Sequence, residues 1–185
     1  MKEVVDVLGI SGSLRKGSFN TALLRAAIAR SPASVQIEVA SIADIPLYNE
    51  DVRAQGFPES VAKLRERIAA CDALLIVTPE YNYSVPGVLK NAIDWASRPP
   101  SPPFAGKALA IMGASASVGG TMRAQYHLRQ MAVYLDMHPL NKPEIFVKSA
   151  AGAFDAEGNL TDETTKKLIT QQLEALVVWA RKLGA

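Results

Sequence analysis

Apolar residues gather in five short runs along the chain, and longer amphipathic stretches separate these runs. Residues 4–10, 73–77 and 107–114 are almost continuously apolar, which is typical of strands buried on both faces. Residues 35–39 alternate between apolar and polar, as in a strand covered on one face, and residues 144–147 form a shorter fifth run. The pattern therefore predicts five strands.

The stretches between the runs carry apolar residues at helical spacing. In residues 18–30 the apolar side chains recur every three or four positions, so they line one face of a helix. The same reasoning predicts helices at residues 58–70, at 86–97 and at about 119–135. A polar capping sequence at 161–163 opens a last amphipathic helix.

This regular alternation of strand and helix predicts one domain over residues 1–185 with a flavodoxin-like three-layer α/β sandwich. Five strands in this length favour a parallel sheet of order 2-1-3-4-5 over the six-stranded dinucleotide-binding fold. That order reverses direction between the first and third strands, and ligands bind beyond the carboxyl ends of the strands at such a point. We therefore expect a site between loops 11–17 and 79–85, with loop 115–120 beside it.

Composition narrows the class of protein. The chain is 49% hydrophobic and 21% charged, and Lys plus Arg outnumber Asp plus Glu by only 20 to 18, with no basic stripe that would favour nucleic-acid binding. Cys71 is the single cysteine, which excludes an internal disulfide and suits a reducing compartment. No signal-peptide pattern and no apolar run of about 20 residues is present, so we expect a cytoplasmic protein without membrane insertion.

The loop after the first strand is the main candidate for ligand binding. Residues 12–20 read GSLRKGSFN and lie where a buried strand meets a helix N-terminus, whose free N–H groups and positive dipole suit a phosphate. The hydroxyls of Ser13 and Ser18 add donors, and Arg15 adds a planar cation. The loop lacks the lysine of a Walker A motif and the pattern GxGxxG, which favours a cofactor with a single phosphate. The alternative is an ordinary capped turn.

Two further loops face the same edge of the sheet. Residues 78–87, TPEYNYSVPG, offer Tyr81 and Asn82 to the plane and the polar edge of a flat heterocycle, although the tyrosines could equally pack on neighbouring groups. Residues 115–121, SASVGGT, are again small and rich in donors. Convergence of three such loops favours a ligand over simple packing.

Residues 12–20 and 79–87, followed by LKNAIDW at 89–95, resemble the bacterial NAD(P)H-dependent FMN reductase family, and its chromate- and quinone-reducing branch in particular. The resemblance also covers residues 45–51 and 125–130. It extends through most of the chain and is weakest after about Lys148.

The resemblance implies a bound FMN held by three groups of residues. The phosphate loop of the family is matched here by Ser13, Arg15, Ser18, Phe19 through its N–H, and Asn20. The loop along the isoalloxazine ring is matched by Pro79, Glu80, Tyr81 and Asn82, and the third loop by Ser115, Gly119 and Gly120. Members of the family are typically dimers or tetramers, and the residues expected at their subunit interface are Tyr83, Arg123, Tyr126 and Glu144. An exposed ion pair of little energetic weight is the alternative reading of this last group.

The resemblance also implies a reaction. NADPH or NADH would pass hydride to flavin N5, and quinones, chromate, azo or nitro compounds or free flavin would then accept it at the same face, in ping-pong order. The sequence shows no Ser/His/Asp or Cys/His arrangement, so the cofactor carries the chemistry and no side chain is assigned as catalytic, including His127 and His138. One alternative is a non-enzymatic electron carrier of the flavodoxin type, although such carriers are usually acidic and this chain has a pI of about 8.7. A flavin-free phosphate or nucleotide hydrolase is the other.

Overall fold

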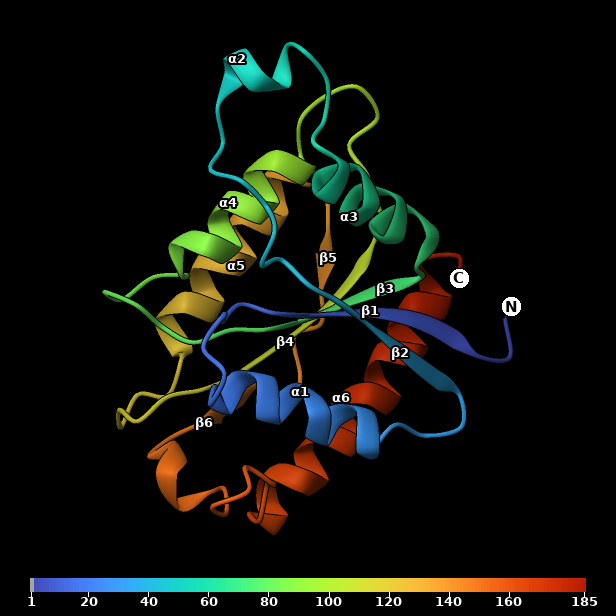
Figure 1. The fold of residues 1–185 in the computed structure, drawn as a ribbon. Coiled ribbons are helices and arrows are strands. Elements are labelled where there is room, and N and C mark those ends of the chain that lie inside the picture. The colour runs from blue at the N-terminus through green and yellow to red at the C-terminus, as the bar shows by residue number, and fades with distance from the viewer. Residues whose placement is uncertain (1) are drawn as a thin grey trace.

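A parallel β-sheet forms the middle layer of the computed structural model, which describes residues 2–185 (Figure 1). Its strands are β1 (Val5–Ser11), β2 (Val35–Ala40), β3 (Ala73–Val77), β4 (Ala108–Ala114), β5 (His138–Pro139) and β6 (Ile145–Val147). The strand order is β2-β1-β3-β4-β5, and every pairing is parallel. The predicted fold class and strand order are therefore confirmed.

The fifth position of the sheet differs from the prediction, because two short strands share it. Both pair with β4: His138 aligns with Ala108, and Ile145 aligns with Met112. Pro143 lies between them and has no N–H to donate to the ladder. In the gap, the side-chain amide of Gln172 donates to the carbonyl of Ile111 at 3.1 Å and so replaces a ladder hydrogen bond. The predicted strand at 144–147 is confirmed as β6, whereas β5 was not predicted from the sequence.

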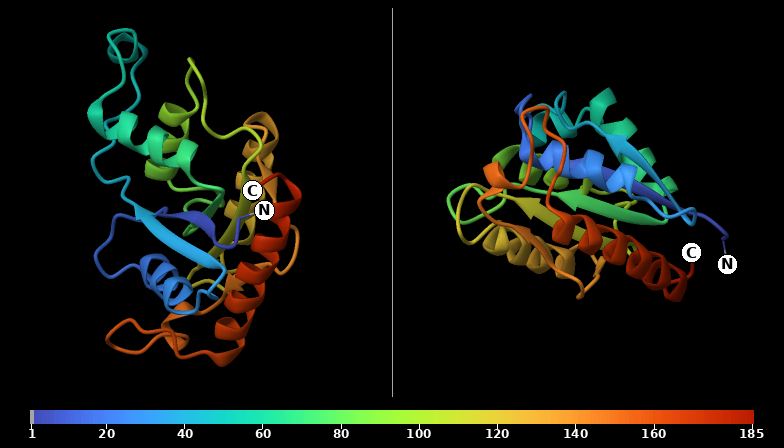
Figure 2. Two further views of the ribbon diagram at one scale, coloured as in Figure 1. Left: turned by 90° about the vertical axis from the view of Figure 1, so that its right-hand side faces the viewer. Right: turned by 90° about the horizontal axis from the view of Figure 1, so that it is seen from below.

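Helices cover both faces of the sheet (Figures 1 and 2). One face is covered by α1 (Phe19–Ala29) and α6 (Glu163–Lys182), and the other by α3 (Glu59–Ala70), α4 (Gly87–Ala96) and α5 (Met122–Tyr134). The sequence pattern did not predict two short elements, α2 (Glu50–Arg53) and the 3₁₀ turn η1 (Ala150–Gly152). The side chain of Asn49 caps α2 by accepting from the N–H of Asp51 at 2.8 Å.

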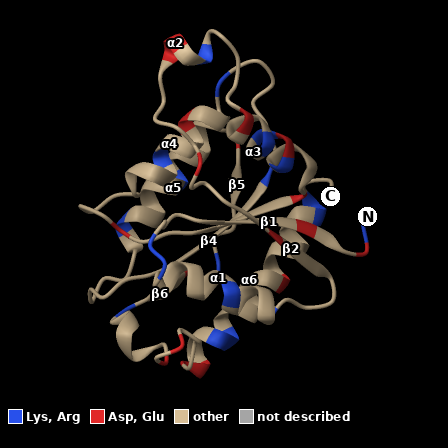
Figure 3. Ribbon diagram, viewed as in Figure 1, with Lys and Arg blue, Asp and Glu red and all other residues tan. Residues whose placement is uncertain are grey.

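Successive strand residues point into two separate cores. Val7 and Leu75 pack on the face covered by α1 and α6, whereas Leu8 and Leu74 pack on the face covered by α3, α4 and α5. This two-sided burial explains why the central strands are continuously apolar in sequence. Charged residues of both signs are mixed over the outer helices (Figure 3). Within residues 2–185 no helix has the length and apolarity required to cross a bilayer.

The two ends of the described chain lie side by side (Figures 1 and 2). The Arg181 guanidinium near the end of α6 donates to the backbone carbonyl of Glu3 at 2.8 Å. The three loops predicted to form the site leave the sheet at the opposite edge, on the left in Figure 1.

Candidate active site

Three strand-to-helix loops meet at the carboxyl edge of the sheet. The first residue of each loop continues the ladder to a neighbouring strand: Gly12 donates to Val77 at 2.8 Å, Thr78 to Met112 at 3.0 Å, and Ser115 to Val147 at 3.0 Å. The loops are therefore held in fixed positions relative to one another at their bases, and the structure brings the predicted site residues of all three to one edge.

A glycine that sequence reasoning missed lies beneath these loops. A Cβ placed on Gly113 of β4 would lie 2.2 Å from both the carbonyl oxygen of Thr78 and the hydroxyl of Thr121. Such separations leave no room for any side chain. Glycine inside an apolar strand commonly marks a close approach of this kind, so the signal was present in the sequence.

The first loop ends in the N-terminal cap of α1. Ser18 is buried, and its hydroxyl accepts from the N–H groups of Asn20 at 3.2 Å and Thr21 at 3.4 Å. The cap does not use the N–H of Phe19, the first residue of the helix. The exposed guanidinium of Arg15 lies 5.9 Å from the centre of the Phe19 ring. A free N–H, a helix dipole and a cation thus meet at one point, which suits a phosphate dianion.

Asn20 also belongs to this loop but has a different partner. Its buried carboxamide accepts from the N–H of Ala114 at 2.9 Å and donates to the carbonyl of the same residue at 2.9 Å. The structure therefore places the Asn20 side chain as a link between α1 and the end of β4, directly below the loop.

The second loop contains a tight turn over residues 81–84. Tyr81 and Ser84 exchange backbone hydrogen bonds of 3.0 and 2.9 Å, while Asn82 and Tyr83 have φ angles of 50° and 62°. Two consecutive left-handed residues of this kind define a type I′ turn. Tyr81 is 51% exposed in this arrangement, so its ring is accessible to a flat ligand.

Glu80, the residue before the turn, points its carboxylate at α5. One carboxylate oxygen accepts from the N–H of Arg123 at 2.9 Å and of Ala124 at 3.1 Å, and the other lies 3.4 Å from the Arg123 guanidinium. The Glu80 side chain is only 8% exposed. The carboxylate therefore joins the second loop to the start of α5.

The third loop contains two adjacent glycines, of which one has little room for a side chain and the other has space beside it. Gly120 has a φ of 60°, and a Cβ there would lie 3.1 Å from the Cβ of Phe146. At Gly119 the nearest atom to an added Cβ is the Arg123 guanidinium, at 3.6 Å. Ser115 accepts from the N–H of Ser117 at 3.1 Å and so shapes the start of the loop.

The four residues expected at a subunit interface form two pairs on and beside α5. The Arg123 guanidinium lies 3.9 Å from the centre of the exposed Tyr83 ring. The hydroxyl of Tyr126 donates to the carboxylate of Glu144 at 3.2 Å. His127, which received no role from the sequence, approaches the hydroxyl of Ser84 with its Nδ1 atom at 2.9 Å.

Cys71 lies outside this site. It is buried at the end of α3, and desolvation by burial raises the pKa of its thiol. A buried thiol with a raised pKa is a poor nucleophile. Within residues 2–185 no group of three or more potential metal ligands is found.

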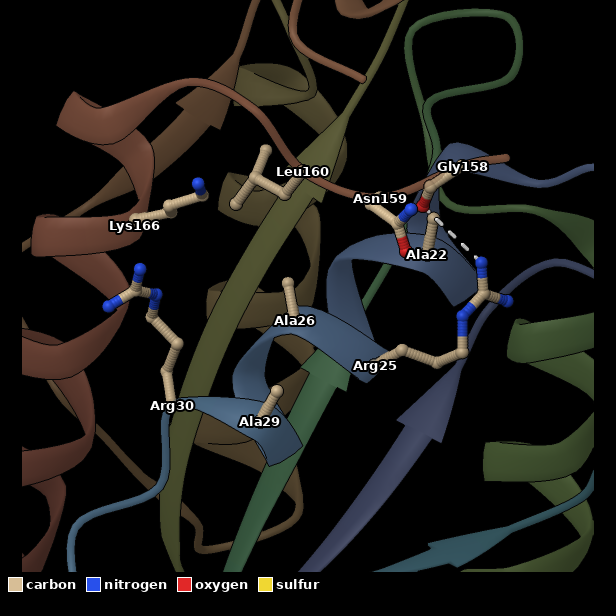
Figure 4. A pocket seen from close by; sticks show the side chains of 9 residues that line it. All are labelled: Ala22, Arg25, Ala26, Ala29, Arg30, Gly158, Asn159, Leu160 and Lys166. Carbon is tan, nitrogen blue, oxygen red and sulfur yellow. Dashed lines mark hydrogen bonds between the residues drawn. The ribbon is translucent and has the colours of Figure 1, made fainter. Parts of the chain in front are cut away.

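A separate groove of about 520 Å³ lies between α1, residues 158–160 and the start of α6 (Figure 4). Arg25, Arg30 and Lys166 line it, together with alanines of α1 and residues 158–160. Arg25 donates to the carbonyl of Gly158 at 3.4 Å, and Lys166 is paired with Glu163 at 2.7 Å. No predicted site residue lines this groove, so it is distinct from the edge of the sheet where the three loops meet.

The groups that the three loops bring together fit FMN. The start of α1 supplies the N–H of Phe19 and the cation of Arg15 for a phosphate. Tyr81 supplies an accessible aromatic face, and the absence of a side chain at Gly119 leaves space beside the third loop.

Comparison with known proteins identifies the family that the sequence motifs resemble. The sequence profile of the family described as NADPH-dependent FMN reductase matches residues 5–152. An NAD(P)H-dependent FMN reductase of Pseudomonas aeruginosa is 62% identical over 183 residues, which cover 99% of each chain. A quinone reductase of Escherichia coli is 48% identical over 178 residues, which cover 95% of each chain.

The solved structure of the flavoenzyme NAD(P)H:(acceptor) oxidoreductase from Paracoccus denitrificans superposes with a TM-score of 0.88. That protein is 38% identical, and the match covers 98% of this chain and 100% of the other. The chain described here therefore belongs to the NADPH-dependent FMN reductase family and is an oxidoreductase that uses FMN and a nicotinamide nucleotide.

Proposed function

We propose that this enzyme reduces quinones with NADPH or NADH by a ping-pong mechanism at the crevice between the three loops. The observation that carries the proposal is the meeting of a phosphate-binding helix start, an accessible tyrosine and an open glycine at one edge of the sheet. Two relatives with 46–48% identity bear the names NADPH:quinone oxidoreductase and quinone reductase, which supports quinones as acceptors.

FMN, when bound, supplies the redox chemistry, because its N5 atom can accept and return a hydride. The role of the protein is to bind the cofactor and to orient it. Arg15, the Ser13 hydroxyl and the N–H of Phe19 would hold the phosphate, while Ser18 and Asn20 fix the helix start that presents this N–H.

The remaining site residues act on the ring of the cofactor. The exposed Tyr81 and Asn82 would contact the ring, together with Pro79 and the backbone of Glu80. Backbone donors of the third loop, near Ser115, Gly119 and Gly120, would complete the binding site for the ring. Such donors stabilise negative charge that develops on the flavin during reduction.

The exposure of Tyr81 and Asn82 also favours a broad range of acceptors. Chromate, azo compounds, nitro compounds and free flavin are further candidates, since each needs only access to the reduced flavin. The balanced charge of 20 basic against 18 acidic residues disfavours the alternative of a flavodoxin-type carrier, which docks through a strongly charged face.

We further propose that the active form is a homodimer or homotetramer. The contact surface consists of exposed residues on and near α5, namely Tyr83, Arg123 and Tyr126, together with the partly buried Glu144. A cytoplasmic location stays a prediction from the sequence.

The direct test is a visible spectrum of the purified protein under anaerobic conditions. We expect a flavin spectrum that NADPH or NADH bleaches and that a quinone then restores. Steady-state kinetics should give parallel double-reciprocal lines, and intersecting lines would contradict a shared site. A coloured protein that neither nicotinamide bleaches would favour the carrier, and a colourless protein without FMN uptake would favour the hydrolase.

A further inference from the structure

Three side-chain contacts fasten the second loop to the first two turns of α5. The Glu80 carboxylate binds the N–H groups of Arg123 and Ala124, the Arg123 guanidinium covers the Tyr83 ring, and the Ser84 hydroxyl meets His127. Between these anchors Tyr81 and Asn82 remain exposed. The loop thus has one set of side chains committed to α5 and another set available to a ligand.

The start of α5 depends on this contact. Its own capping residue, Thr121, makes no side-chain cap, and the first turn of the helix contains no acidic residue. Free N–H groups at a helix start need an acceptor, and a carboxylate there also interacts favourably with the helix dipole. Glu80 supplies both functions from another loop, across 43 residues of sequence.

The turn depends on the same contact. Asn82 tolerates a left-handed backbone, but Tyr83 has no local side-chain hydrogen bond that would favour its φ of 62°. Residues in such conformations persist only where their surroundings hold them. Here the surroundings are α5, through Glu80 on one side of the turn and Arg123 above it.

We infer that Glu80 is the positioning residue of the flavin site: by capping α5 it holds the turn of residues 81–84 in the conformation that presents Tyr81 and Asn82 to the isoalloxazine ring. This inference rests on the proposed function. It assigns the Glu80 carboxylate to the protein scaffold and leaves ring contact to the backbone of Glu80 and to the two exposed side chains.

The test compares Glu80→Ala and Glu80→Gln with Asp162→Ala, which removes the cap of α6 instead. Quenching of FMN fluorescence measures affinity, and hydrogen exchange in the protein without added FMN measures local opening. We expect Glu80→Ala to weaken FMN binding about tenfold, as for the loss of one well-made polar interaction. Exchange should rise at the amides of Arg123 and Ala124 and at the turn. Glu80→Gln keeps an acceptor oxygen and should bind FMN within about threefold of the wild type. Asp162→Ala should lower the melting temperature but leave FMN affinity unchanged.

Three outcomes would overturn the inference. Wild-type affinity in Glu80→Ala would show that the cap does not position the ring. An equal loss in Asp162→Ala would trace the effect to general destabilisation, and a Gln variant as weak as the Ala variant would show that capping is not the cause. Failure of the wild type to bind FMN would count against the proposed function, while the exchange measurement would still test whether Glu80 couples α5 to the turn.

Discussion

The two adjacent glycines of the third loop differ in whether the fold requires glycine at their position. Gly120 has a left-handed backbone and a close neighbour in Phe146, so the fold itself requires glycine there. Gly119 has no positive φ, and an added Cβ would find only ordinary contacts. A glycine that the fold does not need, at the rim of a ligand crevice, is consistent with close approach of the ligand to the backbone.

Alanine at these two positions should therefore give opposite results. Gly120→Ala should lower the free energy of unfolding by about 1 kcal/mol or more, because its φ becomes strained. Gly119→Ala should change stability by less than about 0.5 kcal/mol yet weaken FMN binding about tenfold, since its methyl group would occupy the cofactor's space. Urea denaturation and FMN titration of both variants measure the two effects. Unchanged FMN affinity in Gly119→Ala would place the ring away from this loop.

Helices in this chain are capped by different means. Ser18 and Asp162 cap α1 and α6 locally, whereas α5 takes its cap from Glu80 in another loop. Asn20 likewise ties α1 to β4 across 94 residues of sequence. Glu80 and Asn20 therefore join the ends of different elements where the loops meet, whereas α3 begins after Pro58 without a side-chain cap.

The cap of α6 gives a pH dependence with a defined sign. Hydrogen bonds from the side chain and the backbone N–H of Thr165 hold the pKa of Asp162 below its ordinary value of 3.8. A lowered pKa in the folded state means that the stabilisation is complete above pH 3.8 and is lost as the pH falls through the folded-state value. Asp162→Ala should thus cost about 1 kcal/mol near neutral pH and progressively less below the ordinary pKa.

Urea denaturation at several pH values measures this difference between wild type and variant. Asp162→Asn serves as the control, because its amide oxygen can cap the helix but does not titrate. If the difference in free energy of unfolding between wild type and Asp162→Ala increased as the pH fell, the ionised Asp162 carboxylate would not be the stabilising cap.

Much of the fold could be predicted at the level of elements, because parallel strands buried on both faces leave continuous apolar runs such as residues 73–77. The break between β5 and β6 could not, since it depends on a side chain of α6 that fills the gap in the ladder. In the site, the topology predicted which loops meet. The hydrogen-bond partners of Glu80 and Asn20 could not be predicted, because they are backbone groups remote in sequence and any residue type provides such groups.

At the scale of the whole molecule, the three site loops lie at one edge of the sheet, and an exposed face of α5 lies beside them. Arg123 and Tyr126 lie on this face of α5, with Tyr83 from the second loop and Glu144 beside β6. Tyrosine and arginine are enriched at subunit contacts. Since Arg123 also contacts Glu80, a partner seated here would lie next to the anchor of the second loop.

The double variant Arg123→Ala/Glu144→Ala should therefore lower the mass of the assembly in solution, with the larger change at low protein concentration. Light scattering coupled to size exclusion measures it. Lys167→Ala/Glu174→Ala removes one charge of each sign from exposed positions on α6 and is the matched control. If Arg123→Ala/Glu144→Ala left the mass of the assembly unchanged, the subunit interface would not be at this face of α5.

The close approach at Gly113 also has a consequence for how the substrate range of this enzyme can be altered. Libraries that randomise the crevice can vary its outer positions, such as Val118, which is 84% exposed, without disturbing the sheet. Gly113 admits no alternative residue, because the backbone of the second loop and the hydroxyl of Thr121 already fill the space. New acceptor preferences in this chain are therefore accessible through its loop tips, while the floor on which they rest stays invariant.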